Sequence, residues 1–121
     1  MTAKRRRAYR FGLRAETAAG LCLMLKGYRI LARRYRTPAG EIDLIVKRGK
    51  LVAFVEVKAR HSMAAAADAL TPTAERRIAT AADLWLARHP AATGLTMRFD
   101  LVLVAPWRLP AHMPDAYRPS R

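Results

Sequence analysis

The stretch that most constrains the fold runs from Gly40 to Arg60 and reads GEIDLIVKRGKLVAFVEVKAR. Two runs rich in Val, Ile, Leu and Phe flank the dipeptide Arg48-Gly49, a pattern that predicts two strands joined by a tight turn. Asp43, Glu56 and Lys58 interrupt these otherwise apolar runs. Because a buried charge is costly unless it is paired or bound to a metal, these three residues need an explanation other than packing.

The expected register of the hairpin brings the three charged residues together. With Arg48-Gly49 as the turn, counting back along the two strands places Asp43 opposite Phe54. Glu56 is then the diagonal neighbour of Asp43 on the same face, and Lys58 follows two residues later on that face. We therefore expect three ionisable groups at one end of an apolar sheet.

Two kinds of interaction would stabilise such a cluster. Mg²⁺ or Mn²⁺ would relieve the repulsion between the two carboxylates, since hard divalent ions prefer carboxylate oxygens and keep waters that can be activated. Lys58 beside the ion would orient or deprotonate an attacking water, and phosphodiester hydrolysis needs this set of groups. The alternative is a salt bridge from Lys58 to Glu56 or Asp43 that only sets the strand register. The residues alone leave both interpretations open.

The formal net charge of the 121 residues is +14, which exceeds what solubility requires. This excess indicates a polyanionic partner, either a nucleic acid or an anionic membrane surface. The first eleven residues, 1–11, predict a basic N-terminal arm with the cations Lys4, Arg5, Arg6, Arg7 and Arg10. The arm is either a solvated tail or a segment that contacts phosphates and becomes ordered on binding.

The remaining residues predict one α/β domain at 12–105, since a chain of this length supports a single core. Its expected elements are a helix at 12–26, a strand at 28–37, the hairpin, a helix from Thr71 or Thr73 to about Arg88, and a strand at 97–106. The order α-β-β-β-α-β supplies helices for both faces of a sheet. Trp85 belongs to the apolar stripe of the second helix and is expected in the core.

Two further segments carry weaker signals. The alanine-rich passage HSMAAAADALTPT at 61–73 predicts a loop with a helical piece. Residues 106–121 contain too many prolines for a regular element, so we expect an extended segment that covers the domain. Trp107 and Tyr117 are its expected anchors.

The compartment is inferred from features that the sequence lacks. The apolar run AAGLCLML after the basic N-terminus is closed by Lys26 and has no small-residue cleavage pattern, which argues against a signal peptide. No apolar stretch has the length of a membrane span. The single cysteine, Cys22, gives neither a disulfide framework nor a cysteine-based metal site. We therefore expect a cytoplasmic protein that does not partner a membrane.

Five stretches resemble, in order, the bacterial YraN family of predicted endonucleases: GYRILARRYRTPAGEIDLIV, FVEVKAR, RRIATAA, RFDLVLV and HMPDAY. GEIDLI and FVEVK at their spacing are the most specific of these. The resemblance implies a branch of the restriction-endonuclease-like PD-(D/E)xK superfamily, close to the archaeal Holliday-junction resolvases. It also implies the fold of that superfamily, a restriction-endonuclease-like α/β core in which a mixed β-sheet is flanked by helices.

The resemblance implies a role for each charged residue of the motif. Asp43 and Glu56 would be the metal ligands, Lys58 the catalytic lysine and Glu16 a further catalytic acid from the first helix. Glu41 is a second-rank candidate, because alternation puts it on the Asp43 face. The first helix of the family usually carries a Gly-Glu pair. This chain has Ala15-Glu16 at that place, so the glycine is replaced and the acid is kept.

The expected nucleic-acid-binding residues are six arginines: Arg33, Arg34, Arg36, Arg60, Arg76 and Arg77. The second helix of the family usually begins with Lys-x-Arg-Arg, whereas this chain reads TAERRI. If the missing lysine contacts a phosphate in the family, Arg76 and Arg77 would have to compensate for it here.

The favoured function is a divalent-metal-dependent endonuclease that hydrolyses DNA phosphodiester bonds with Mg²⁺ or Mn²⁺. Branched or junction DNA is favoured by family analogy alone. The alternative is a non-catalytic nucleic-acid-binding protein that keeps the nuclease fold. Junction resolution would require two active sites and therefore a homodimer, of which the sequence gives no direct sign.

Overall fold

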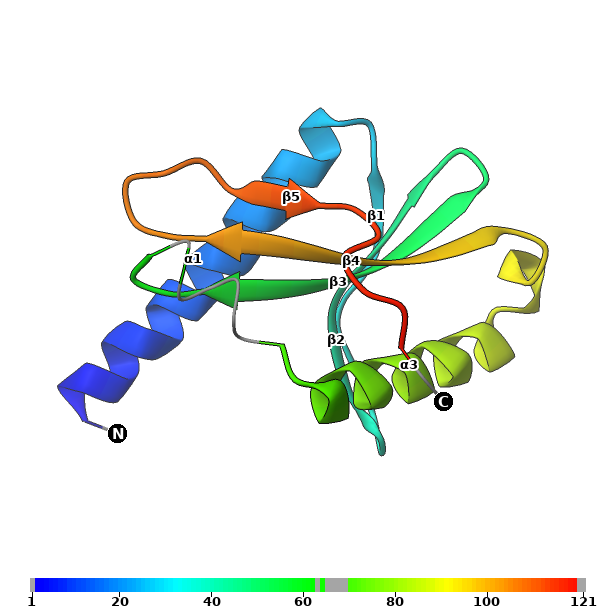
Figure 1. Cartoon of the computed structure of the whole chain (residues 1–121), viewed down its shortest axis with the longest axis horizontal. Helices are drawn as coiled ribbons and strands as arrows, with labels where there is room; N and C mark the ends of the chain where they lie inside the picture. The colour runs from blue at the N-terminus through cyan, green and yellow to red at the C-terminus, as the bar shows by residue number, and fades with distance from the viewer. Residues whose placement is uncertain (1, 63, 65–69, 120–121) are drawn as a thin grey trace.

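The computed structural model describes residues 2–62, 64 and 70–119. A five-stranded sheet runs through the middle of the molecule, with one long helix against each face (Figure 1). The elements are α1 (Ala3–Leu25), β1 (Arg29–Thr37), β2 (Gly40–Arg48), β3 (Leu51–Ala59), α3 (Pro72–Arg88), the 3₁₀ turn η1 (Pro90–Ala92), β4 (Thr96–Val104) and β5 (Ala111–Met113).

The sheet is mixed, as expected. Its strand order is β1-β2-β3-β4-β5, in which β3 and β4 are parallel and every other neighbouring pair is antiparallel. The parallel pair is joined through α3, which crosses one face of the sheet, as parallel neighbours require a crossover. The prediction of an α/β fold with a mixed sheet flanked by helices is confirmed, and it is consistent with a restriction-endonuclease-like core.

Each face of the sheet has its own core. On the α1 face, the small residues Ala15 and Ala19 and the larger Leu23 pack against Val55 of β3 and Val102 of β4. Small residues let the helix axis approach the sheet closely, and the covered strand positions are fully buried.

On the opposite face, α3 packs through Ile78, Ala82 and Trp85 against Ile45 and Phe54. The Trp85 and Phe54 rings meet edge to face with their centroids 5.7 Å apart. The prediction that Trp85 lies in the core is confirmed, and of the two predicted caps, Thr71 and Thr73, the structure shows Thr71. The Thr71 hydroxyl caps the helix by accepting a hydrogen bond from the Ala74 N–H at 3.1 Å.

The expected start of the first helix at Gly12 is wrong. The helix begins at Ala3, where the Thr2 hydroxyl accepts a hydrogen bond from the Arg5 N–H at 3.1 Å. Arg and Lys are good helix formers, so the basic run after the Thr2 cap is helical although it has no apolar stripe from which a helix could be predicted. The backbone of residues 3–11 therefore belongs to α1.

The expected turn of the hairpin is wrong by one residue. Arg48 pairs with Leu51, so Gly49 and Lys50 form the turn. Gly49 has a φ of +59°, and glycine is favoured at such a first turn position because it lacks a Cβ. Phe54 consequently pairs with Ile45 and is not opposite Asp43.

The tail departs from the expectation in part. Residues 111–113 form β5, which pairs antiparallel with β4, so the segment does contain a regular element. Tyr117 is buried as expected, whereas Trp107 is fully exposed and anchors nothing. The alanine-rich passage at 61–73 falls largely outside the described residues. No helix of the described ranges is both long enough and apolar enough to span a membrane.

Candidate active site

The strands β2 and β3 separate at Asp43. The last pair of the ladder is Leu44 and Val55. One residue further in the same register, Asp43 lies across from Glu56. There the Oδ2 atom of Asp43 accepts a hydrogen bond from the Val57 N–H at 2.8 Å. The carboxylate therefore takes the place of a strand carbonyl as the acceptor for the Val57 N–H, and it lies between the two strands.

Glu56 and Lys58 form a close pair on one face of β3. The Lys58 Nζ lies 3.2 Å from the Glu56 Oε1, and the side chains are 19% and 14% exposed. Val57 packs on the α1 face, so strand alternation directs Glu56 and Lys58 to the face that carries Phe54 and α3. The two carboxyls and the ammonium thus meet at the end of the sheet where β2 and β3 diverge.

The two carboxyls do not both ionise easily. Burial, followed by the neighbouring Glu56 charge, raises the pKa of Asp43 to about 8, against the opposing hydrogen bond from Val57. Burial also raises the pKa of Glu56, although the Lys58 charge lowers it. In the absence of a cation, protonation of Asp43 relieves the repulsion between the two carboxyls near neutral pH.

Glu16 approaches Asp43 from the α1 side. Its Oε2 atom accepts a hydrogen bond from the Arg34 Nε at 2.8 Å, and its negative charge raises the pKa of Asp43. Arg34 has a φ of +50°, an unusual backbone conformation for a residue with a side chain. Glu16 is therefore close enough for its charge to act on Asp43, and Arg34 already balances that charge.

The other five predicted arginines are exposed and are spread over several elements. Arg33 and Arg36 lie on β1, Arg60 follows β3, and Arg76 and Arg77 lie in the first turns of α3. The Arg36 Nε is 3.4 Å from a Glu41 carboxylate oxygen. Arg76 contacts the Thr73 hydroxyl at 3.3 Å. Glu41 is thus an exposed partner of Arg36, and the arginines do not form one compact cluster with the acids.

The donor set at Asp43 and Glu56 fits a divalent metal ion. A proton between two carboxylates and a divalent cation bound to both are alternative solutions to the same repulsion. Among residues 2–62, 64 and 70–119, no three His, Cys, Asp or Glu side chains form a complete metal cage. Mg²⁺ needs no such cage, because it is commonly held by one or two carboxylates together with waters and substrate phosphates. Asp43 and Glu56 are therefore the residues that would hold it.

A second buried polar cluster surrounds Asp100, the one charged residue among the described positions that is completely buried. Arg98 donates to both carboxylate oxygens at 2.7 Å, and the Asp115 backbone N–H donates at 3.0 Å. The His112 Nε2 lies 2.8 Å from the carboxylate. Burial alone would raise the pKa of Asp100, but these hydrogen bonds lower it to about 2.

The Asp100 cluster ties the tail to the rest of the fold. The Lys26 Nζ lies 2.9 Å from the His112 Nδ1. Since an ammonium only donates, Nδ1 is the acceptor and Nε2 carries the proton that faces Asp100. Arg98 also donates to the Tyr28 hydroxyl at 2.6 Å. Sequence reasoning did not select Asp100, although an aspartate inside the apolar run RFDLVLV was the available signal.

Comparisons with known proteins agree on one family. Residues 15–104 match the sequence profile of the uncharacterised protein family UPF0102. A UPF0102 protein of Rhizobium leguminosarum bv. trifolii is 57% identical over 116 residues, which is 96% of this chain and 95% of that protein. One of Parvibaculum lavamentivorans is 58% identical over 112 residues, covering 93% and 84% of the two chains, and one of Mesorhizobium japonicum is 57% identical over 116 residues, covering 96% and 93%.

Proposed function

The chain belongs to the family UPF0102, and on the basis of its site we propose that it is a divalent-metal-dependent endonuclease that hydrolyses phosphodiester bonds, with DNA as the favoured substrate. The observation that carries this proposal is the pair of adjoining carboxyls, Asp43 and Glu56, next to the Lys58 ammonium. Two neighbouring acids whose pKa values are raised by burial do not stabilise a fold. The same arrangement is useful to an enzyme that binds a cation there.

The proposed roles follow from position and chemistry. Asp43 and Glu56 would hold Mg²⁺ or Mn²⁺, which when bound activates water and neutralises charge on a phosphate. Lys58 lies beside Glu56. As an ammonium it would orient the attacking water and stabilise negative charge on a phosphate oxygen, and as the neutral amine it would accept the proton of that water. The Val57 N–H fixes the Asp43 carboxylate between the strands. Glu16 is a supporting acid that adds negative charge beside Asp43.

The charge of the protein supports a nucleic acid as the partner. The net charge of +14 favours a polyanion, and exposed arginines on β1, after β3 and at the start of α3 would contact phosphates independently of base sequence. Arg34 is a weaker candidate for such contacts, because its guanidinium already pairs with Glu16.

The test is cleavage of labelled duplex, single-stranded and four-way-junction DNA with Mg²⁺ or Mn²⁺. We expect the wild type to cut at least one substrate, and Asp43→Ala and Lys58→Ala to cut none while still binding DNA. Asp83→Asn, which removes an exposed acid from α3, is the matched control and should cut like the wild type. Cleavage that persists in Asp43→Ala would refute the proposed site.

A second candidate function is nucleic-acid binding without catalysis. The 3.2 Å contact between Lys58 and Glu56 favours it, since this pair already partly neutralises the site. In that case all of these proteins would bind DNA with equal, salt-sensitive affinity, and none would cut it.

A further inference from the structure

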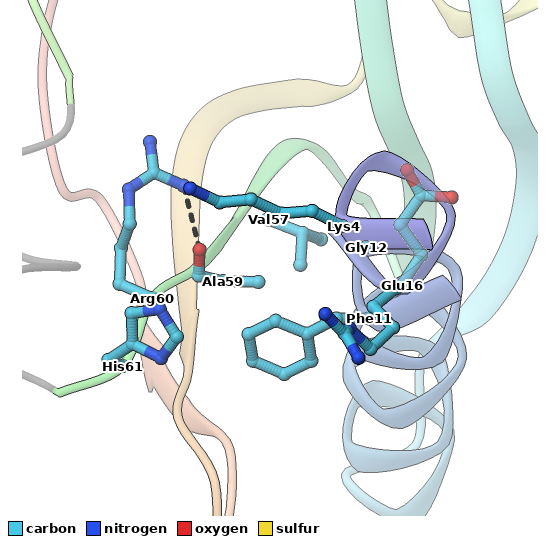
Figure 2. Close-up of a pocket in the computed structure, with 10 residues that line it drawn as sticks. Lys4, Phe11, Gly12, Glu16, Val57, Ala59, Arg60 and His61 are labelled. Carbon is cyan, nitrogen blue, oxygen red and sulfur yellow. Dashed lines mark hydrogen bonds between the residues drawn. The ribbon is translucent and has the colours of Figure 1, made fainter. Parts of the chain in front are cut away.

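A pocket of about 650 Å³ lies on the α1 face of the sheet, between the first half of α1 and the end of β3 (Figure 2). Its volume is within the range of small-molecule sites. Two of its lining residues connect it to the candidate active site. The Val57 N–H holds the Asp43 carboxylate, and the Glu16 charge acts on that carboxylate. The pocket therefore lies on the sheet face opposite to Lys58, and Val57 and Glu16 connect it to Asp43.

The walls of the pocket combine cations with an aromatic ring. Lys4 and Arg7 come from α1, and Arg60 directly follows β3. The Arg60 guanidinium donates to the Ala59 carbonyl at 2.7 Å, which keeps it at the rim. The Phe11 ring projects from α1 into the space toward His61 (Figure 2). Gly12, Ala15, Val57 and Ala59 add small and apolar wall beside the ring, and Glu16 and His61 complete the lining.

A cationic rim around an aromatic ring is the arrangement that proteins use for unpaired nucleotides. Cations hold the phosphates, and aromatic side chains stack on bases without regard to sequence. An acidic peptide would use the cations but would leave the Phe11 ring without a partner. A fatty acyl chain would use the ring but would need a deeper apolar cavity than one bordered by five ionisable side chains.

We propose that this pocket binds one unpaired nucleotide of the substrate, with its base against Phe11 and its phosphates on Lys4, Arg7 and Arg60. The proposal rests on the proposed function and narrows it. A paired base is stacked in the duplex and can enter such a pocket only after extrusion, which costs several kcal/mol, whereas a base in a single strand enters at little cost. The substrate class is therefore nucleic acid with an unpaired strand next to the phosphate that reaches Asp43.

Gly12 provides a variant that fills the pocket without disturbing the fold. It lines the pocket, and a Cβ added there meets no heavy atom within 4 Å. Leucine at this position would add bulk at the pocket wall and is also a better helix residue than glycine. Gly94 has equally open surroundings and does not line the pocket, so Gly94→Leu is the matched control.

The experiment measures binding without cleavage, by fluorescence anisotropy in EDTA on an Asp43→Asn background. The probes are a labelled single-stranded oligothymidylate and a blunt duplex of equal length. We expect Gly12→Leu and Phe11→Ala to weaken binding of the single strand about tenfold, since stacking on one aromatic ring contributes about 1–3 kcal/mol per base. Duplex binding should change less than about twofold, and Gly94→Leu should change neither probe.

The result separates this proposal from the proposed function. Unchanged single-strand binding in Gly12→Leu, or equal losses for both probes, would overturn the nucleotide pocket even if the wild type cuts DNA. A selective loss of single-strand binding would support the pocket even if the wild type cuts nothing, because no step of the measurement depends on cleavage.

Discussion

The Oδ2 atom of Asp43 accepts the Val57 N–H at 2.8 Å at the point where the β2–β3 ladder ends. This one contact accounts for much of the site. It holds the carboxylate between two strands, next to Glu56, where burial makes ionisation unfavourable. The strand separation and the perturbed acid are therefore two results of the same local geometry.

The raised pKa of Asp43 makes the metal-free protein less stable as the pH rises. Below pH 3.8 the group is protonated in both the folded and the unfolded chain. Between pH 3.8 and about 8 the unfolded chain releases the proton while the folded protein retains it, so the free energy of unfolding falls with increasing pH. Asp43→Asn should remove this slope and stabilise the protein at pH 8 by about 1–3 kcal/mol. Urea unfolding in EDTA at several pH values measures it, with Asp83→Asn as control.

Identical slopes in the wild type and in Asp43→Asn would show that Asp43 ionises at its ordinary pKa, and that its burial is less severe than the structure indicates.

Mn²⁺ should stabilise the wild type, because a ligand that binds only the folded state raises its stability. The gain is about 2.7 kcal/mol at a free concentration one hundred times the Kd. The thermal midpoint should then rise by several degrees in scanning calorimetry. The effect should grow between pH 6 and pH 8, since the ion replaces a proton held by the two carboxyls.

Asp43→Ala and Glu56→Gln should lose most of the Mn²⁺ effect, whereas Asp83→Asn should retain it. An equal rise of the thermal midpoint in all four proteins would mean that Mn²⁺ binds elsewhere. Asp43 and Glu56 would then not form a metal site.

Asp100 should be the most sensitive charged residue for stability. Asp100→Asn leaves Arg98 and His112 without their anionic partner in a buried position, which typically costs about 3–5 kcal/mol. The hydrogen bonds lower its pKa from 3.8 to about 2, so the stabilisation is present above pH 3.8 and is lost as the pH falls through about 2. Urea unfolding at pH 7 and in acid measures both effects.

The control for Asp100 is Arg118→Ala, which removes the exposed ion pair with Asp115. Exposed pairs contribute little to stability, so this variant should be close to the wild type. If Asp100→Asn were as mild as Arg118→Ala, the cluster would not be what fastens β5 to β4.

The features of the fold that could be predicted from the sequence are those that depend on residues close together in the chain. Helix caps, apolar stripes and the mixed sheet could be predicted, because Thr71, Trp85 and the strand pattern each act through near neighbours. The register of the hairpin could not be predicted, because Arg48-Gly49 and Gly49-Lys50 are both acceptable turns. The choice between them depends on the pairing of all residues along the two strands. That shift moved Asp43 from opposite Phe54 to across from Glu56, and so brought the two acids closer than expected.

The Asp100 cluster and the pocket beside Phe11 were missed for a related reason. Their members are distant in the chain, as with Lys26 and His112 or Phe11 and His61, and no spacing rule connects them. A capped run of cations likewise gave no apolar period from which a helix at residues 3–11 could be predicted.

Tyr117 and Trp107 should respond very differently to truncation, although both are large aromatic residues of the tail. Trp107 is fully exposed, so Trp107→Ala should change the free energy of unfolding by less than about 0.5 kcal/mol. The Tyr117 ring packs on Phe99 with centroids 5.5 Å apart, and Tyr117→Ala should cost about 3–5 kcal/mol.

Tyr117→Phe tests the hydroxyl separately from the ring. Among the described residues, the Tyr117 hydroxyl is a buried polar atom without a hydrogen-bond partner. Burial, together with the nearby Glu56 charge, raises its pKa, so it is a neutral group that has lost its contact with water. Removing such a group should be neutral or should stabilise the protein by up to about 1 kcal/mol in urea unfolding. A loss greater than about 1 kcal/mol would instead mean that the hydroxyl has a partner in solution. Repeating the measurement with Glu56→Gln would then show whether that partner is Glu56, because in that case the two substitutions would not be additive.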